Sequence, residues 1–510
     1  MALPLVAGLG CLAGQAAAST WTSTGNGNWS DPLNWTGGVP DAAGADANLA
    51  TNPGNATLGT TITIDGFTRT VGSIEKATSN KYTIAATGNG TLAFNTGNSS
   101  VATITQTISG NNKGLLISAP MRLDSSLSIN NGTTESVSLS GQIDMNGRTL
   151  TIIGSGSGGV VLSGNLTGAG NIIQNSSNSV LTLGGDNQQY SGNYTVSAST
   201  SMSLSGGTGN VINNVANIVT IDGSLKSDAN SITLAGLIGA ATGLLTRTDN
   251  GGTGKTIKLA GSGSYTYLGA ITRTGSGGTL GLNKTGNGTQ VFGGALSYNG
   301  ATAVGAGTML INGTLQASSG VAVSSGATLG GNGTIGTSTF GVGVSVASGG
   351  TLAPGSGGVG TLATGNLTLS SGSHLQIEYD TTTNTADKAS VTGNVSLNGA
   401  ILELSHLPAN TTINPYNHTF VLIDNDGGDA IVGTLTGTGL GTRTGDTQSI
   451  SFAALQATLY YAYDSLNSTT SGGNDLAIRF TSVPEPGTGC LAVFAGAGWL
   501  LKRRRRVTVT

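Results

Sequence analysis

The residues that could do chemistry in this chain are few and scattered. The three histidines, His374, His406 and His418, match neither metal-binding nor catalytic-triad spacing. Glu378 and Asp380 lie two residues apart in an alternating segment, so both carboxylates are expected on one face of a strand, where an acid–base pair could work. No basic residue is near them in the sequence. We therefore interpret the pair as a solvated strand edge and predict that the chain is not an enzyme.

Three further carboxylates gather in a short acidic run, Asp424, Asp426 and Asp429. Their density is that of a calcium-binding loop. However, Gly428 stands where an EF-hand loop has a ligand, and no Glu closes the loop. We expect a solvated turn, with weak calcium binding as the alternative, and we expect no cofactor.

Three tryptophans fall within fifteen residues near the N-terminus: Trp21, Trp29 and Trp35. Aromatic rings clustered in this way could stack on sugar rings. They could equally bury the exposed end of a folded body. We expect the second role, an N-terminal cap, and keep glycan contact as the alternative.

The elements that position these residues are expected to be short β-strands. Of 510 residues, 86 are Gly, and only 8% are charged and 5% aromatic, which does not suit ordinary globular domains. Gly and Asn supply turns, whereas Thr, Val, Ile and Leu supply strands. Apolar residues alternate with polar ones in many short segments, each closed by Gly, Asn or Ser. These include Ile62/Ile64, Leu181/Leu183, Val321/Val323, Leu367/Leu369 and Leu375/Ile377/Tyr379.

The strand segments also recur as quasi-repeats. One copy runs from Gly168 to Val196 and contains LTLGGDN at 181–187 and YSG at 190–192. A second runs from Leu282 to Leu310 and contains KTGNGT at 284–289. Both resemble the autotransporter-associated β-strand repeat, although the first lacks the Lys-x-Gly opening and the second lacks an Asn before its Tyr. The resemblance implies a right-handed parallel β-helix that serves as a passenger or stalk.

The N-terminal segment is typical of an export signal. Residues 3–12 are apolar, and a small-residue run follows in which Ala16 and Ala18 fit an A-x-A cleavage site. No Lys or Arg precedes the apolar stretch, which a start codon placed too far downstream would explain. The only cysteines, Cys11 and Cys490, lie in the two terminal apolar segments. Consequently we expect no disulfide framework in the body.

The C-terminal segment carries the most specific motif. Val483, Pro484, Glu485 and Pro486 precede an apolar stretch, residues 487–501, and a basic cluster follows: Lys502, Arg503, Arg504, Arg505 and Arg506. This order resembles the PEP-CTERM sorting domain of Gram-negative bacteria. The resemblance implies recognition by an exosortase-type transpeptidase, a membrane helix at 487–501 before processing, and a cytoplasmic stop at the basic cluster. A plain tail anchor is the alternative.

We therefore predict an all-β fold, a right-handed parallel β-helix (solenoid) with an N-terminal cap and a single C-terminal transmembrane helix. The expected segments are a signal peptide at 1–18, a cap at 19–60, β-helix repeats at 61–400 with the recognisable copies near 160–200 and 280–316, a closing β segment at 401–482, and the sorting tail at 483–510.

The predicted function is structural or adhesive. The tail contains five basic residues and Glu485, so the rest of the chain has 15 basic and 22 acidic residues. This excess of acidic residues excludes a nucleic-acid binder. We expect display at the cell surface or in the extracellular matrix, with extracellular polysaccharide as a partner. A polysaccharide-active β-helix enzyme and a glycan-binding module are the alternatives.

Overall fold

The computed structural model describes residues 18–50, 59–110, 114–205, 211–227, 231–248, 254–275, 277–316, 319–336, 343–407, 418–426, 428–452 and 455–482. Within these ranges every regular element is a β-strand, apart from one short 3-10 helix, η1 (Pro32–Asn34). The chain divides into two compact units. Unit 1 comprises Met1–Gln290 and Gly294–Asn299, and unit 2 comprises Val291–Gly293 and Gly300–Thr510.

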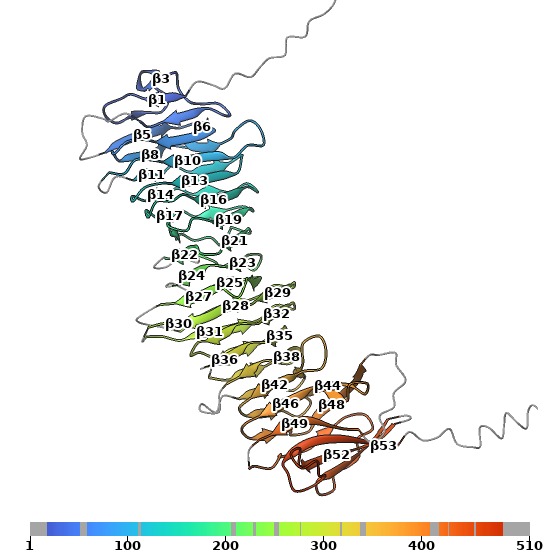
Figure 1. Cartoon of the computed structure of the whole chain (residues 1–510). Helices are drawn as coiled ribbons and strands as arrows, with labels where there is room; N and C mark the ends of the chain where they lie inside the picture. Colours follow the sequence, from blue (N-terminus) through green and yellow to red (C-terminus); the bar gives the residue numbers. More distant parts are fainter. Residues whose placement is uncertain are drawn as a thin grey trace, which may run out of the picture. The chain divides into compact units, whose positions relative to one another are not determined.

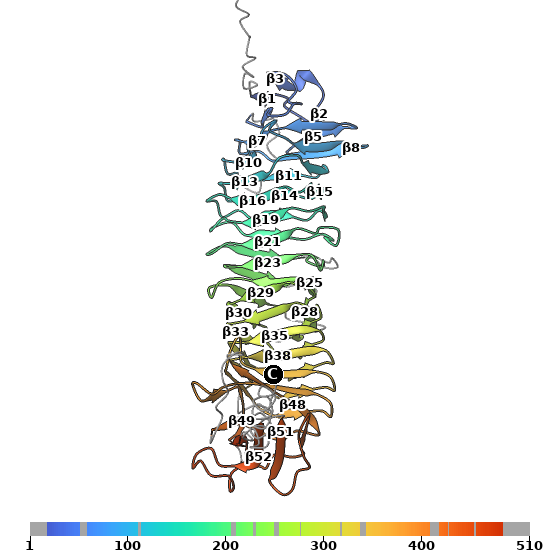
Figure 2. The ribbon, with the colours of Figure 1, turned by 90° about the vertical axis from the view of Figure 1, so that its right-hand side faces the viewer.

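In unit 1 each turn of the chain adds one short strand to each of up to three parallel ladders (Figure 1). The first ladder consists of β3 (Trp35–Thr36), β1 (Ser19–Trp21), β4 (Asp46–Asn48), β7 (Ser73–Lys76), β10 (Ala102–Gln106), β13 (Leu127–Asn131), β16 (Thr149–Ile153), β19 (Asn171–Gln174), β21 (Asn193–Val196), β23 (Ile218–Ile221) and β26 (Gly236–Ile238). Among the described strands of this ladder, only β1 and β3 pair antiparallel. Figure 2 shows β7 to β23 of this ladder stacked in sequence order.

The second ladder of unit 1 consists of β2 (Gly27–Asn28), β5 (Thr60–Asp65), β8 (Tyr82–Thr87), β11 (Leu115–Ile117), β14 (Val137–Leu139), β17 (Val160–Leu162), β20 (Leu181–Leu183), β22 (Ser201–Leu204), β24 (Ser224–Ser227), β27 (Leu244–Arg247), β30 (Ala270–Arg273) and β33 (Ala295–Ser297).

The remaining strands of unit 1 are β6 (Thr68–Val71), β9 (Thr91–Phe94), β12 (Met121–Leu123), β15 (Ile143–Asp144) and β18 (Leu166–Thr167), then β25 (Ile232–Leu234), β28 (Lys255–Leu259) and β31 (Leu280–Lys284), and β29 (Ser264–Tyr267). β32 (Thr289–Phe292) includes residues of both units.

The core of unit 1 is made of identical positions from successive turns. Leu127 pairs with Leu150, and Leu150 pairs with Ile172, so one turn takes a little over twenty residues. Ile104, Ile129 and Ile152 form a second stack of paired residues, and all of these side chains are fully buried. Parallel in-register stacking places like side chains about 4.8 Å apart, which gives a continuous aliphatic column.

Polar side chains interrupt the aliphatic columns of unit 1 at one corner. Gln106 pairs with Lys76 on one side and with Asn131 on the other, and all three are fully buried. The Gln106 Nε2 donates to Asn131 Oδ1 at 3.3 Å, and Asn131 Nδ2 donates to the Gly158 carbonyl at 2.8 Å. Buried amides must find partners. Here the stack and the corner backbone supply them.

Unit 2 repeats the arrangement of stacked turns. Its first ladder contains β35 (Gly307–Ile311), β38 (Ala327–Gly331), β41 (Thr351–Pro354), β44 (His374–Asp380), β48 (Ala400–Leu407) and β50 (Leu435–Thr436), and β45 (Thr385–Ala386) pairs with β44. The second contains β36 (Thr314–Gln316), β39 (Thr334–Ile335), β42 (Thr361–Thr364), β46 (Lys388–Val391) and β49 (Thr419–Asn425). The third contains β34 (Thr302–Val304), β37 (Val321–Val323), β40 (Val344–Val346), β43 (Leu367–Leu369) and β47 (Val395–Ser396).

Unit 2 closes with an antiparallel group instead of further parallel turns. β51 (Thr447–Phe452) pairs with β52 (Leu455–Tyr463), β52 with β53 (Asp475–Ser482), and β53 with β49. The parallel part before it has the same aliphatic columns as unit 1. An example is Leu329, Leu352, Leu375 and Leu402, which pair in series and are all buried.

The predicted all-β parallel solenoid is therefore confirmed. The predicted fold class also included a single C-terminal transmembrane helix, and that part of the prediction is wrong. In the part of the chain that the structure describes, no helix is long and apolar enough to cross a membrane. The predicted segment, 487–501, lies outside the described residues. A helix of that length would span about 22 Å, less than the bilayer core of about 30 Å. Its four glycines also disfavour a helix.

Candidate functional site

The polar residues of β44 and β48 lie side by side on one face of the first ladder of unit 2. Gln376 pairs with Glu403, and Glu378 pairs with Ser405. Alternation explains the orientation, because the intervening Leu375 and Ile377 are buried in the core. The polar side chains at these positions therefore point away from the core.

A hairpin brings another carboxylate to this face. β45 turns back along β44, with Tyr379 paired to Ala386, and Asp387 follows directly. Asp387 is 2% exposed. Its Oδ2 accepts from the Glu378 N–H at 2.9 Å and its Oδ1 from the Gly360 N–H at 2.8 Å, while its own N–H donates to the Glu378 carbonyl at 2.7 Å.

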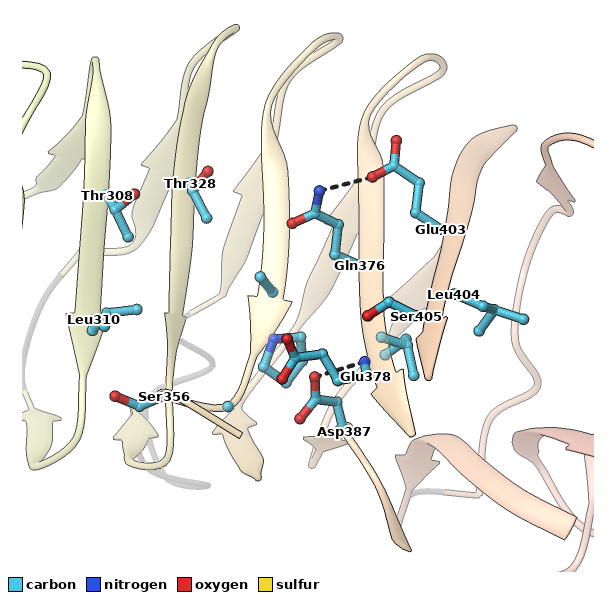
Figure 3. Close-up of a pocket in the computed structure, with 15 residues that line it drawn as sticks. Thr308, Leu310, Thr328, Ser356, Gln376, Glu378, Asp387, Glu403, Leu404 and Ser405 are labelled. Carbon is cyan, nitrogen blue, oxygen red and sulfur yellow. Dashed lines mark hydrogen bonds between the residues drawn. The ribbon is translucent and has the colours of Figure 1, made fainter. Parts of the chain in front are cut away.

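These side chains line a hollow of about 380 Å³ (Figure 3). The hollow crosses five neighbouring strands of the first ladder, β35, β38, β41, β44 and β48. Small residues form part of its lining, and the rest is divided between apolar and polar side chains. The lining residues are Thr308, Leu310, Thr328, Ala353, Pro354, Gly355, Ser356, Gly357, Gln376, Ile377, Glu378, Asp387, Glu403, Leu404 and Ser405.

The three carboxylates of the hollow have different environments. Burial raises the pKa of the Asp387 carboxyl to about 6, and the nearby Glu378 carboxylate also raises it. The two backbone N–H groups that donate to Asp387 lower its pKa, but burial has the larger effect. Hydrogen bonds from Gln376, at 2.8 Å, and from His374, at 2.6 Å, hold the pKa of Glu403 below its ordinary value. Glu378 makes no side-chain hydrogen bond or ion pair with the described residues.

The hollow is therefore an acceptor-rich site. None of its 15 lining residues is Lys or Arg. Asp387 beside Glu378, as Figure 3 shows, could hold or release a proton near neutral pH, and both could accept hydrogen bonds from hydroxyl or ammonium groups. The described residues contain no group of three or more His, Cys, Asp and Glu suited to holding a metal ion.

The residues predicted from sequence to do chemistry are only partly brought together. Glu378 lines the hollow, but Asp380 does not; its Oδ1 accepts from the Thr382 N–H at 2.7 Å. His374 borders the hollow through its contact with Glu403. His406 Nε2 lies 2.8 Å from Thr381 Oγ1, and His418 stacks on Phe420 at 6.1 Å between ring centroids.

The three tryptophans pack against one another in unit 1. Trp21 and Trp29 are fully buried and Trp35 is 5% exposed. Trp35 lies 5.1 Å from Trp21 and 5.0 Å from Trp29 between ring centroids, and Trp29 Nε1 donates to the Pro40 carbonyl at 2.9 Å. A sugar-stacking role needs an exposed ring face, and these three rings offer none.

The acidic run does not come together as a metal-binding group. Asp424 pairs with Lys388, with 2.7 Å between Nζ and Oδ2, and Asp426 is exposed. The Asp429 carbonyl accepts from Asn425 Nδ2 at 2.8 Å, which closes the turn. Asp424 thus has a protein partner, Asp426 faces solvent, and Asp429 contributes its carbonyl to the turn.

The predicted export and sorting residues lie outside the described part of the chain, except Ala18, which is exposed. This applies to Ala16, to the motif Val483, Pro484, Glu485 and Pro486, and to the basic cluster Lys502, Arg503, Arg504, Arg505 and Arg506.

Gln376, Asp387 and Glu403 line the hollow but were not predicted from the sequence as site residues. Gln376 and Glu403 are one turn apart, and Asp387 reaches the face only through the β45 hairpin. The alternating polar positions of 374–380 and 400–405 were a usable signal for the first two. No family model matches the chain, and no curated protein matches it either.

Proposed function

We propose that this chain is a structural or adhesion-type β-solenoid displayed outside the cell and associated with an extracellular polysaccharide matrix. The observation that carries the proposal is the repeated parallel turn. Successive turns in each unit use the same buried aliphatic positions, such as Ile104, Ile129 and Ile152, and face outward with Thr, Ser and Asn. Such scaffolds extend a surface by repetition.

Sorting through the tail is the second part of the proposal. An exosortase-type transpeptidase would recognise Pro484-Glu485-Pro486, because the two prolines favour an extended backbone that can bind in an enzyme's active site. In the native cell, replacing Pro484-Glu485-Pro486 with three alanines should leave the full-length chain in the cell envelope and reduce the amount at the surface.

The matched control for this test is Thr481→Ala, just outside the motif. Immunoblots of envelope and surface fractions, with protease treatment of intact cells, give the readout. Equal surface display of the triple-alanine variant and the control would remove the sorting role.

A polysaccharide-active enzyme is the second candidate function, favoured by the hollow that brings Glu378, Asp387 and Glu403 to one face. A lyase would need a cation to stabilise its anionic intermediate, and the lining has no Lys or Arg; a hydrolase would need only the paired carboxylates. A scaffold should release no reducing ends from matrix polysaccharide. Release that disappears in Asp387→Asn would instead establish the enzyme.

A further inference from the structure

The hollow of unit 2 presents negative charge without an internal counterion. Glu378, Asp387 and Glu403 all line it, and its other lining residues are uncharged. Glu403 already accepts hydrogen bonds from His374 and Gln376. The Glu378 carboxylate, in contrast, makes no hydrogen bond or ion pair with the described residues, and it stands beside Asp387 (Figure 3). A site of this charge favours a ligand that carries a cationic group.

The hollow also offers more than charge. Leu310, Ala353 and Pro354 form an apolar part of the lining, and Thr328, Gln376 and Ser405 add hydroxyl and amide groups. The five strands that contribute residues span about 19 Å, taking about 4.8 Å for each neighbouring pair. An elongated site with apolar, hydroxyl-binding and anionic parts matches a saccharide chain, whose rings have both C–H faces and hydroxyl edges.

A metal ion fits the arrangement less well. Both oxygens of Asp387 already accept a backbone N–H, from Glu378 and from Gly360. The described residues include no metal-holding group. A hydrogen-bonding ammonium group needs only one lone pair from each carboxylate: each Asp387 oxygen keeps a second lone pair beside its backbone N–H, and the Glu378 carboxylate makes no hydrogen bond or ion pair with the described residues.

We propose that this hollow binds an oligosaccharide that carries free amino groups, such as a chain of glucosamine units. One ammonium group lies between the Glu378 and Asp387 carboxylates, and a ring face rests against Leu310 and Ala353. The site depends only on the β35–β48 ladder and the β45 hairpin. It does not depend on export or on the sorting tail, so it can fail while the proposed function stands.

Titration calorimetry on the full chain at pH 7, with the β-1,4-linked tetramer of glucosamine as probe, tests the site. The tetramer should bind. The fully N-acetylated tetramer should bind at least tenfold more weakly, because acetylation removes the charge. Glu378→Gln should lower the affinity for the glucosamine tetramer about tenfold or more, since one charge-assisted hydrogen bond is lost.

Asp426→Asn is the matched control, because Asp426 is an exposed carboxylate of the same unit outside the hollow. It should bind as the unchanged chain does. Circular dichroism checks that Glu378→Gln is folded, which is expected because the Glu378 side chain makes no hydrogen bond with the described part of the chain. The proposal is overturned by absent binding, by equal binding of the acetylated tetramer, by equal binding of spermidine, or by equal losses in Glu378→Gln and Asp426→Asn.

Discussion

At the scale of single residues, Asp387 is the side chain most changed by its surroundings. It is 2% exposed, and burial raises the pKa of its carboxyl to about 6 from an ordinary value of 3.8. Two backbone N–H groups fix its orientation. The same placement that makes it a candidate ligand-binding group therefore makes it a cost to the folded state once it is ionised.

This cost predicts a pH dependence of stability. Below about pH 3.8, Asp387 is protonated in both the folded and unfolded chains. Between pH 3.8 and about 6 the unfolded chain loses the proton first, so the contribution of Asp387 to stability falls as pH rises and is fully lost above the folded pKa. Asp387→Asn has no carboxyl at this position and lacks its pH-dependent contribution to stability. The difference in melting temperature, unchanged chain minus variant, should therefore fall between pH 4 and pH 6.5.

Exposed Asp426→Asn serves as the comparison for this series and should show no such trend. A difference between the unchanged chain and Asp387→Asn that stays constant, or grows, across this pH range would contradict the raised pKa of Asp387.

The site could be predicted only in part at this scale. Glu378 was identifiable, because alternation in residues 375–379 fixes its face. Glu403 and Asp387 were not identified as its neighbours, because the number of residues per turn varies and a hairpin intervenes between β44 and β46. Register between turns depends on long-range packing, which alternation alone does not contain.

At the scale of elements, the alternating segments define the strands well. Ile62/Ile64, Leu181/Leu183, Val321/Val323, Leu367/Leu369 and Leu375/Ile377 are buried in strands, as predicted. The reason is local: a side-chain period of two places every second residue in the core, and turns of Gly, Asn and Ser end each run. What the pattern did not contain is the antiparallel group β51 to β53 that closes unit 2.

Because the aliphatic columns are fully packed, truncating one of their side chains should lower the free energy of unfolding substantially. Ile129 is fully buried and pairs with Ile104 on one side and Ile152 on the other. Ile129→Ala should destabilise the chain by about 2–5 kcal/mol, because it leaves a cavity between two turns. The neighbouring Ser128 points outward, so Ser128→Ala should change stability by less than about 0.5 kcal/mol.

Urea unfolding followed by circular dichroism measures both changes, and hydrogen exchange localises them to the turns around β13. Similar stabilities for Ile129→Ala and Ser128→Ala would argue against the stacked core.

Close packing at the corners of the turns leads to a further prediction about stability. A Cβ on Gly164 would clash with the carbonyl oxygen of Gly141, the corresponding corner of the preceding turn. Gly164→Ala should therefore destabilise unit 1 by about 1–3 kcal/mol through overpacking. Gly25→Ala is the control, because a Cβ there meets no atom within 4 Å. Thermal unfolding should separate the two variants; equal melting temperatures would show that the corners are not stacked in this way.

At the scale of the whole molecule, composition and alternation predicted many short strands closed by turns. The quasi-repeats and the family that they resemble were needed to predict the parallel solenoid, and both units contain stacked parallel strands. The predicted transmembrane helix was the error. It was inferred from an apolar stretch whose length and glycine content suit a spanning helix poorly.

Parallel, in-register stacking of successive turns is the central structural feature of both units, and paired cysteines test it directly. In a Cys11→Ser, Cys490→Ser background, Ser345 and Thr368 are changed to cysteine. They pair on adjacent strands β40 and β43 and are both exposed. A second pair joins Thr368→Cys to Ala322→Cys, one strand further away on β37. The separations are about 4.8 Å and about 9.6 Å.

Dibromobimane, which becomes strongly fluorescent when both of its arms react with thiols, gives the readout. We expect fluorescence to develop rapidly in the Ser345→Cys/Thr368→Cys chain and to stay low in the Ala322→Cys/Thr368→Cys chain. No cross-link in the first chain, or equal cross-linking in both, would contradict the stacked parallel solenoid.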